Sequence, residues 1–451
     1  MSLFFEKAQA FFETGKTFDV DFRLQMLESL YAWIQTHQSE IEKALFQDLS
    51  KSDFEAFMTE IGIALSEISH VKKHLKKWVQ KEKVKTPISL FPAKSYKLYR
   101  PYGPVLILSP WNYPFLLAVE PLVSAIAAGN TAVVKPSLKT PHVADLLLKL
   151  ALEVFPDAEV QVALGDHALA DALMAEPFQF IFFTGSPRIG HHVMEIASKN
   201  LTPVVLELGG KSPCVVDESA DLELSAKRIA FGKLINAGQT CVAPDFVLVQ
   251  KKVQRRFEEF LVKAFKTFAP QGAETESLPS IVDDAHLNRL QNFLPSGEVL
   301  LGGSSFGKKF APTVLSDVSW DSPVMQEEIF GPILPVLSYD SEEELLKRLN
   351  RLPRPLAFYI FSGNKRWIRR VQKELHFGGM CVNDTLMHIA SSELPFGGVG
   401  NSGMGRYHGE AGFKTFSHEE SVLERGTWLD LDFRYPPFTD AKKKLVQFFL
   451  K

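Results

Sequence analysis

The sequence predicts an α/β protein made of two doubly wound α/β domains with a small β arm. Three observations lead to this prediction. First, 451 residues are too many for one hydrophobic core, so the chain should divide into two or three domains. Second, short apolar runs alternate with helical stretches from Pro104 onward, which indicates parallel strands joined by helices. Third, a similar series starts again after Gly210.

Residues 1–80 are expected to be helical, because apolar residues recur among charged ones at roughly helical spacing. These apolar residues are Leu24, Met26, Leu27, Leu30, Leu45, Phe46, Phe57, Ile61, Ile63, Ile68, Val71 and Leu75. Beyond Lys81 a basic connector with prolines leads to residues 95–100. Polar and bulky residues alternate there, which predicts an exposed strand or hairpin arm.

The first series of strands begins with Val105–Leu108, a wholly apolar run typical of a strand buried on both faces. A helix should follow and end at Gly129, since glycine readily takes the positive φ of a helix end. Thr140-Pro141 predicts another helix start, with a cap residue followed by a first-turn proline. The remaining strands of this series are predicted at 131–134, 160–163, 180–183 and 204–206.

The second series lies after Gly210 and predicts a second α/β domain. Its strand candidates are 214–216, 246–249, 333–336 and 358–361. The glycine string Gly398–Gly403 has the spacing of a dinucleotide-binding turn, but its context is wrong for one. Pro395 interrupts any preceding strand, and the residues that follow contain too much glycine for a helix. We therefore expect a rigid, close-packed loop at this position.

Composition excludes several classes of protein. A net charge of −3 gives no sign of the basic face that nucleic-acid binding needs. The three cysteines, Cys214, Cys241 and Cys381, form no C-x-x-C pair, which argues against disulfides and structural zinc, and favours a reducing, cytosolic setting. The N-terminus lacks a signal-peptide pattern, and no apolar run approaches the ~18–20 residues of a membrane span.

A phosphate-binding turn is predicted at Phe183–Gly190. It follows the strand 180–183, and Ser186-Pro187 is the signature of a helix start. A helix N-terminus after a parallel strand offers free N–H groups to a phosphate, and Gly185 would allow close approach. An ordinary β-to-α turn is the alternative. Lys135 closes the strand 131–134 and faces the same crevice, unless it is simply a solvated lysine.

Cys241 is the candidate nucleophile. Cys214 and Cys381 lie in apolar surroundings and are expected to be small buried hydrophobes. Cys241 instead lies in a loop between Gly238 and Pro244. Neither Lys nor Arg occurs within seven residues on either side, so activation of the thiol would come from the fold or from a bound cofactor.

Three further polar residues follow apparent strands. Glu207 comes after 204–206 and is either a partly buried base or half of an ion pair. Asn112 is either an oxyanion donor or a turn asparagine. Glu328, before the turn at Gly331-Pro332, is either an acceptor for ribose hydroxyls or part of a surface loop.

Together these segments resemble the aldehyde dehydrogenase superfamily. The motifs that carry the resemblance are Pro110–Asn112, Lys135–Ser137, Phe183–Ser186, Glu207–Lys211, Gly238–Cys241 and Glu328–Pro332. Three stretches resemble its class-3 branch, namely Val242–Asp245, Asn383–His388 and Pro395–Gly405. The match runs over about residues 100–410.

The resemblance implies a mechanism and a site. Cys241 would attack the aldehyde, Asn112 and the Cys241 N–H would hold the oxyanion, and hydride transfer to NAD or NADP would leave a thioester. Glu207 would activate the water that hydrolyses it. The residues implied to contact the cofactor are Trp111, Lys135, Gly185, Ser186, Gly190, Leu208, Glu328 and Phe330. Neither a metal nor a nucleic acid is implied.

The resemblance also implies an organisation. Residues 1–81 and 104–208 would form the Rossmann-like cofactor-binding domain, 209–417 the catalytic domain, 82–103 and 418–435 an oligomerisation arm, and 436–451 a tail. A cytoplasmic homodimer acting on medium-chain, long-chain or aromatic aldehydes is expected. The tail, with Lys442–Lys444 followed by few apolar residues, would contact a partner or a membrane surface without spanning a membrane.

One position departs from the family pattern. Leu138 stands where the family usually has a glutamate that binds the adenosine ribose. Without that glutamate, a 2′-phosphate would no longer be repelled by a carboxylate, while Lys135 and Lys139 remain nearby to attract the phosphate. Use of NADP comparable to that of NAD, or better, is therefore expected.

Three other functions compete with this one. A coenzyme-A-acylating dehydrogenase needs no water-activating carboxylate, so Glu207 argues against it. A cofactor-independent thiol esterase would want a histidine beside the thiol, and none is apparent in the sequence. A non-catalytic relative would not need Cys241, Glu207 and Asn112 together. The physiological aldehyde is left open, because residues from distant segments form the substrate tunnel.

Overall fold

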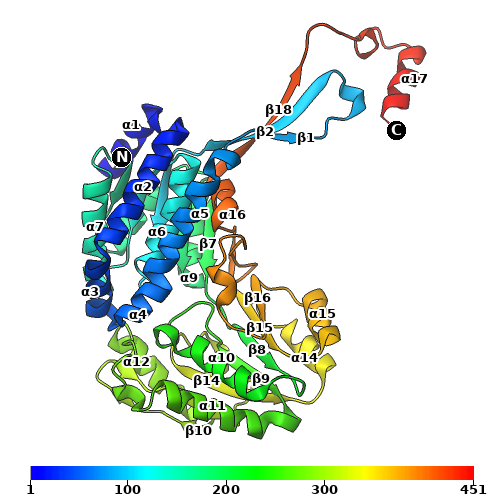
Figure 1. Ribbon diagram of the computed structural model, residues 1–451. Coiled ribbons are helices and arrows are strands. Elements are labelled where there is room, and N and C mark those ends of the chain that lie inside the picture. The colour runs from blue at the N-terminus through cyan, green and yellow to red at the C-terminus, as the bar shows by residue number, and fades with distance from the viewer. Residues whose placement is uncertain (1, 451) are drawn as a thin grey trace.

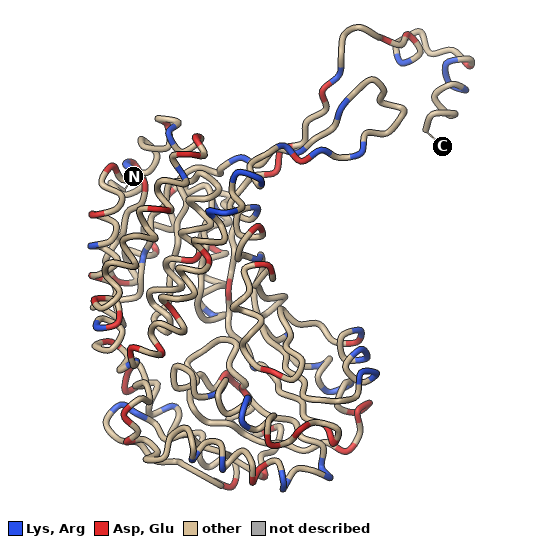
Figure 2. The backbone as a smooth tube through the Cα atoms, in the orientation of Figure 1, with Lys and Arg blue, Asp and Glu red and all other residues tan. Residues whose placement is uncertain are grey.

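The computed structural model describes residues 2–450. Met1, in the predicted segment 1–81, and Lys451, in the predicted tail 436–451, lie outside the described residues. Figure 1 shows two α/β units stacked along the long axis of the molecule, with a thin arm that projects away from the first unit. Basic and acidic residues are interspersed over both units (Figure 2).

The N-terminal region is helical, as predicted. Its helices are α1 (Leu3–Glu13), α2 (Val20–Thr36), α3 (Gln38–Leu49), α4 (Asp53–Ala56) and α5 (Gly62–Trp78). Between α4 and α5 lies a π turn, Phe57–Ile61, in which the N–H of Gly62 donates to the carbonyl oxygen of Phe57. The spacing of apolar residues did not predict this wider turn.

The first sheet has the strand order β17-β7-β6-β3-β4-β5. Its parallel strands are β3 (Pro104–Leu108), β4 (Thr131–Lys135), β5 (Val160–Val162), β6 (Phe180–Gly185) and β7 (Val204–Leu208), and all five were predicted. Val105 and Ile107 pack into one hydrophobic cluster and Leu106 and Leu108 into another. Both faces of β3 are therefore buried, which explains its uninterrupted apolar run.

Helices cover this sheet: α6 (Leu116–Ala128), α7 (Pro141–Val154), α8 (His167–Ala175) and α9 (Pro187–Ser198). The start of α7 was predicted correctly, but its capping residue was not. The Thr140 side chain makes no capping hydrogen bond. Asp48 of α3 caps the helix instead, accepting from the N–H groups of His142 (3.2 Å) and Val143 (2.9 Å). A residue distant in the sequence thus supplies the acceptor.

The second sheet has the order β10-β13-β14-β9-β8-β15-β16. Its predicted strands are β8 (Pro213–Val216), β9 (Phe246–Gln250), β14 (Ile333–Tyr339) and β15 (Ala357–Phe361), and its unpredicted ones are β10 (Glu298–Leu301), β13 (Thr313–Ser316) and β16 (Gly379–Val382). The surrounding helices are α10 (Leu222–Leu234), α11 (Gln254–Phe268), α12 (Asp284–Gln291), α13 (Pro323–Gln326), α14 (Glu342–Leu349) and α15 (Lys365–Glu374). Only β10 runs antiparallel to its neighbour among the pairs described in this sheet.

The glycine string packs tightly against the first sheet, as expected. Strand β17 (Gly403–Met404) pairs antiparallel with β7, and Gly403 lies opposite Glu207. Gly403 has a φ of 143°, and a Cβ atom there would meet the carbonyl oxygen of Leu206. Glycine is therefore required by both conformation and space. Strand β17 and α16 (Gly409–Thr415) come from the predicted range 209–417, yet β17 completes the first sheet and α16 packs on α5 and α6.

The arm is an antiparallel sheet of β1 (Glu82–Val84), β2 (Ala93–Pro101) and β18 (Ser417–Arg425). The strand expected at 95–100 is therefore present. The tail helix α17 (Asp440–Phe449) lies beyond the arm, away from both units (Figure 1). None of its residues is buried. No helix within residues 2–450 has the length and apolar character required to cross a membrane. The boundaries of the predicted segments remain predictions.

Candidate active site

The loops that carry Asn112 and Cys241 are joined directly. Asn112 follows β3 and is buried, and its side-chain Nδ2 donates to the carbonyl oxygen of Gln239 at 3.0 Å. The hydroxyl of Tyr113 lies 2.6 Å from the Thr240 hydroxyl. A primary amide has two N–H donors, so one donor of Asn112 remains for an oxyanion. The structure thus brings together the loops that carry two of the predicted site residues.

The nucleophile loop has an unusual backbone. Asn236 (φ 53°) and Ala237 (φ 50°) are both left-handed, although neither is glycine. Each such residue costs about 1–3 kcal/mol and persists only where the surroundings determine it. Asn236 meets this condition, because its Nδ2 donates to the carbonyl oxygens of Asn112 (2.7 Å) and Gln239 (3.1 Å). Sequence reasoning missed Asn236 and Gln239; an asparagine shortly before a glycine was the available signal.

The pKa of the Cys241 thiol lies far above its ordinary value. Burial, together with the nearby carboxylates of Glu328 and Glu207, raises its pKa to about 12. The thiol is therefore protonated at neutral pH in this state. Loss of negative charge nearby, or arrival of positive charge, would lower its pKa. Cys214 and Cys381 are buried, as expected.

Glu207 lies at the end of β7 and is only 3% exposed. Neither of its carboxylate oxygens has a hydrogen-bond partner among the described residues. Burial raises its pKa well above the ordinary value, and Arg406 opposes that rise. No ion pair of Glu207 occurs within residues 2–450, so the base interpretation fits better than the ion-pair one. A carboxyl group with a raised pKa can take a proton from water near neutral pH.

The Glu328 loop is pinned by charged residues. Arg289 donates to the carbonyl oxygens of Glu328 (3.0 Å) and Ile329 (2.6 Å). Asp245 accepts from the N–H of Ile329 at 2.9 Å and also forms an ion pair with Lys211. The loop is therefore held in one conformation, unlike an ordinary surface loop.

Within this loop, the Glu328 carboxylate lies against Gly209, close after Glu207. Burial, together with the charge of Asp245, raises the pKa of Glu328 to about 8. Phe330, with a φ of 48°, places its ring 5.4 Å from the Trp111 ring. Two residues predicted to contact the cofactor thus meet each other. The ring of His286, which was not predicted, also lies 5.3 Å from the Trp111 ring.

The predicted phosphate turn has the local structure that phosphate binding needs. Helix α9 begins at Pro187 after β6, and the Ser186 side chain makes no capping hydrogen bond. The first N–H groups of α9 therefore remain available to an anion. A Cβ atom at Gly190 would lie 2.7 Å from the Leu208 side chain, so Gly190 lets α9 pack closely on β7. Gly185 lies beside the Phe183 ring.

A cleft of about 1350 Å³ borders this region. Its lining includes Pro187, Gly209, Lys211 and Glu328. It therefore connects the start of α9 with the Glu328 loop. Cys241 and Asn112 are not among its lining residues. No group of three or more His, Cys, Asp or Glu side chains among the described residues is placed to hold a metal ion.

Of the two lysines expected near the crevice, only Lys139 differs from expectation. Lys135 is only 9% exposed, so it is not a solvated lysine; burial lowers its pKa, and its Nζ donates to the carbonyl oxygen of Pro136. Lys139 was expected to attract a phosphate, but it forms an ion pair with Asp283 at 2.7 Å. Its charge is therefore already partnered. Leu138 between them is exposed.

The sequence also did not predict that one lysine, Lys233, would be buried. Lys233 of α10 is fully buried, and its Nζ has no hydrogen-bond partner among the described residues. Burial lowers its pKa to about 8. Nothing in the sequence around Gly232-Lys233 distinguishes it from a surface lysine.

Comparison with known proteins identifies the family of the chain. The model of the aldehyde dehydrogenase family matches residues 2–422. The chain is 45% identical to the 4,4'-diaponeurosporen-aldehyde dehydrogenase of Staphylococcus aureus (strain NCTC 8325 / PS 47), over 99% of this chain and 98% of that protein. It is 40% identical to the dimeric NADP-preferring aldehyde dehydrogenase of Rattus norvegicus, over 96% of each chain. The substrate-bound state of Staphylococcus aureus AldH matches with a TM-score of 0.97 at 45% identity over 100% of both chains.

Proposed function

The chain belongs to the aldehyde dehydrogenase family, in its class-3-like branch, and we propose that it oxidises an aldehyde to a carboxylic acid through a thioester on Cys241. One observation carries this proposal. The Asn112 amide is bonded to the loop of Cys241 and keeps one N–H donor free. A nucleophile and an oxyanion donor are therefore held in one rigid unit.

In the proposed reaction, the Cys241 thiol releases its proton to solvent, and the sulfur of the resulting thiolate attacks the carbonyl carbon. The resulting oxyanion accepts hydrogen bonds from the Asn112 side chain and the Cys241 N–H. When bound, NAD or NADP supplies the acceptor for the hydride that leaves this carbon. The acyl group then remains on sulfur as a thioester.

Glu207 completes the cycle by taking a proton from the water that attacks the thioester. Its two unpartnered oxygens and its raised pKa support this role. Water replaces sulfur at the acyl carbon, the carboxylic acid leaves, and the thiol is regenerated. An acylating enzyme would transfer the acyl group to coenzyme A instead, and Glu207 would then have no function.

The groups available for the cofactor fit a dinucleotide. The free N–H groups at the start of α9 suit a pyrophosphate, and the Glu328 carboxylate suits ribose hydroxyls. Trp111, Phe330, Leu208, Gly185 and Lys135 are assigned to the same binding crevice. We propose that both NAD and NADP are used. Exposed Leu138 offers no charge against a 2′-phosphate, and the relative in Rattus norvegicus is named as NADP-preferring.

We also propose a cytoplasmic homodimer. The arm and tail expose large apolar side chains that a partner subunit would cover, among them Ile88, Phe91, Leu423, Trp428, Phe438 and Phe448. The relative in Rattus norvegicus is described as dimeric. Light scattering at working concentration is expected to give twice the chain mass. A monomer would contradict the dimer.

The substrate is proposed to be a medium-chain, long-chain or aromatic aldehyde. A panel of such aldehydes, incubated with NAD or NADP and with or without coenzyme A, tests the function. We expect the free carboxylic acid and reduced cofactor in equal amounts, regardless of coenzyme A. Formation of an acyl-coenzyme A would instead support the acylating alternative, and ester cleavage alone would support a thiol esterase.

A further inference from the structure

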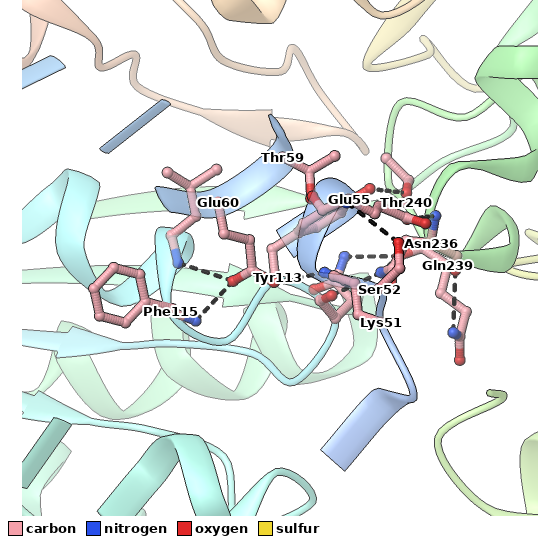
Figure 3. A network of polar contacts seen from close by, with 12 residues as sticks. Lys51, Ser52, Glu55, Thr59, Glu60, Tyr113, Phe115, Asn236, Gln239 and Thr240 are labelled. Atoms are coloured by element: carbon pink, nitrogen blue, oxygen red, sulfur yellow. Dashed lines mark hydrogen bonds and ion pairs between the residues drawn. The ribbon is translucent and has the colours of Figure 1, made fainter. Parts of the chain in front are cut away.

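Polar side chains from the N-terminal helical region reach the active-site loops, although the mechanism above does not use them. Figure 3 shows Lys51, Glu55 and Glu60 between the segment at Tyr113–Phe115 and the segment at Asn236–Thr240. The side chains of Lys51 and Glu60 are fully buried and form an ion pair at 2.5 Å. Burying such a pair is expensive, so its presence calls for a reason other than stability.

Glu60 holds the loop that carries Asn112. Its Oε2 accepts from the N–H groups of Phe115 (2.9 Å) and Leu116 (3.1 Å), at the start of α6. No side chain of that loop caps the helix itself. Lys51, bonded to the other oxygen of Glu60, also places its Nζ 4.4 Å from the centre of the Tyr113 ring. The position of the loop is therefore set by the N-terminal helical region.

Glu55 holds the loop that carries Cys241. Its Oε1 accepts from the N–H of Asn236 at 2.5 Å. Asn236 is the first of the left-handed residues, and its side chain in turn bonds the carbonyl oxygen of Asn112. A strained backbone needs such external contacts to persist. Glu55 contacts Asn236 from outside the two loops, whereas the other outside contacts of the Cys241 loop, from Ser280 and Val282, are made to Gln239.

The π turn Phe57–Ile61 begins just after Glu55 and includes Glu60. Compared with an α-helix, a π turn contains one additional residue per hydrogen-bonded ring, and it occurs frequently at functional sites. Glu55 precedes the turn and Glu60 lies within it. The turn therefore fixes how the two carboxylates are directed relative to each other.

We propose that Glu55 and Glu60 are positioning residues, which hold the Cys241 loop and the Asn112 loop at the separation that the reaction requires. Glu55 acts through Asn236, and Glu60 acts through the start of α6. Neither contacts the reacting atoms in this role. The proposal rests on the function proposed above for Cys241 and Asn112.

The test begins with Glu55 in the full-length chain. Glu55→Ala removes the acceptor for the Asn236 N–H, whereas Glu55→Gln retains one. We expect hydrogen exchange of the peptide that contains residues 235–241 to accelerate in Glu55→Ala and to stay at the wild-type rate in Glu55→Gln. We expect kcat to fall by about 10²-fold in Glu55→Ala, because a displacement of about 1 Å has that effect, with KM for the cofactor unchanged.

Matched variants make the result specific. Asp53→Asn changes an exposed carboxylate on the same helical segment and should leave both exchange and kcat at wild-type values. If Glu55→Ala does not fold, Glu55→Met provides the same test with the volume retained. The Glu60 side is tested in Lys51→Met/Glu60→Met, which removes both charges of the Lys51–Glu60 pair together with the acceptor for the N–H groups of Phe115 and Leu116. In this variant exchange should accelerate at residues 109–117 rather than at 235–241.

Two results would overturn the proposal. One is wild-type exchange at 235–241 in the folded Glu55→Ala or Glu55→Met variant. The other is faster exchange there with unchanged kcat, which would leave Glu55 a purely structural residue. If wild-type protein oxidised no aldehyde, the proposed function would fail on its own, while the exchange rates would still decide whether Glu55 holds the loop.

Discussion

Glu60 and Glu207 are both buried carboxylates near the same pair of loops, yet their surroundings are opposite. Glu60 accepts hydrogen bonds from Lys51 and from the N–H groups of Phe115 and Leu116 at the start of α6. Neither oxygen of Glu207 has a partner within residues 2–450, and burial raises its pKa. A partnered carboxylate fixes the backbone, whereas an unpartnered one can exchange a proton. The difference distinguishes residues that hold the loops in place, such as Glu60, from residues proposed to react, such as Glu207.

The largest expected effect is a difference in stability between variants of Glu60 and Glu207. Glu60→Gln leaves Lys51 buried without a charged partner, so the free energy of unfolding should fall by about 3–5 kcal/mol. Glu207→Gln replaces a group whose raised pKa already penalises the charged form in the folded state. Its stability should therefore not fall at neutral pH. Denaturant titration of both variants checks this, and equal losses would remove the distinction.

Asn112 combines a structural and a proposed catalytic role. Its carbonyl oxygen accepts a hydrogen bond from Asn236, while its side chain faces the nucleophile loop. Asn112→Ala removes only the side-chain donor. We expect kcat to fall by about 10²–10³-fold, with a smaller change in cofactor affinity. Steady-state kinetics and cofactor titration check this. Collapse of cofactor affinity at unchanged kcat would instead make Asn112 a cofactor or structural residue.

The adenosine end of the crevice allows a smaller test. Leu138→Glu introduces a carboxylate that accepts ribose hydroxyls and repels a 2′-phosphate. The ratio of kcat/KM for NAD over NADP should rise by at least about tenfold, equivalent to roughly 1.4 kcal/mol. Because Lys139 is already paired with Asp283, the buried Lys135 is the cation expected to attract the phosphate. Rejection of NADP by the wild type, or an unchanged ratio in the variant, would contradict this account.

The smallest expected effect is on pH dependence. Glu207 acts as a base only when deprotonated, and burial raises its pKa, so turnover limited by hydrolysis should increase with pH until that pKa is passed. Exposed Arg406 lowers the same pKa, so Arg406→Gln should move the rise to higher pH. Rate profiles of wild type and Arg406→Gln test this. A profile that moves to lower pH would be inconsistent with the assignment.

Much of the fold was predictable, because strands such as β3 are buried on both faces and leave uninterrupted apolar runs in the sequence. Strands β10 and β16 were missed because they are short and contain partly exposed residues rather than such a run. Asn112 and Glu207 were identified as candidates because they lie at or just after the ends of recognisable strands, and Cys241 because it lies in a loop between Gly238 and Pro244.

The framework of the site was not predictable from the sequence. Glu55 meets Asn236 across 181 residues, and Glu60 meets Phe115 across 55. No local pattern encodes contacts at such separations. Asp48, which caps α7, was missed for the same reason. Local sequence thus indicated the residues expected to react, while the residues that hold them in place became visible only in three dimensions.

The contrast between the two carboxylates is tested most directly by pre-steady-state kinetics of Glu207→Gln, with Cys241→Ala as the inactive reference. We expect Glu207→Gln to form reduced cofactor in a burst of about one equivalent per site, followed by slow turnover, with the acyl group detectable on Cys241 by mass spectrometry. Cys241→Ala should give no burst and no turnover. Wild-type steady-state turnover in Glu207→Gln would contradict the role of Glu207 as the base that releases the acid.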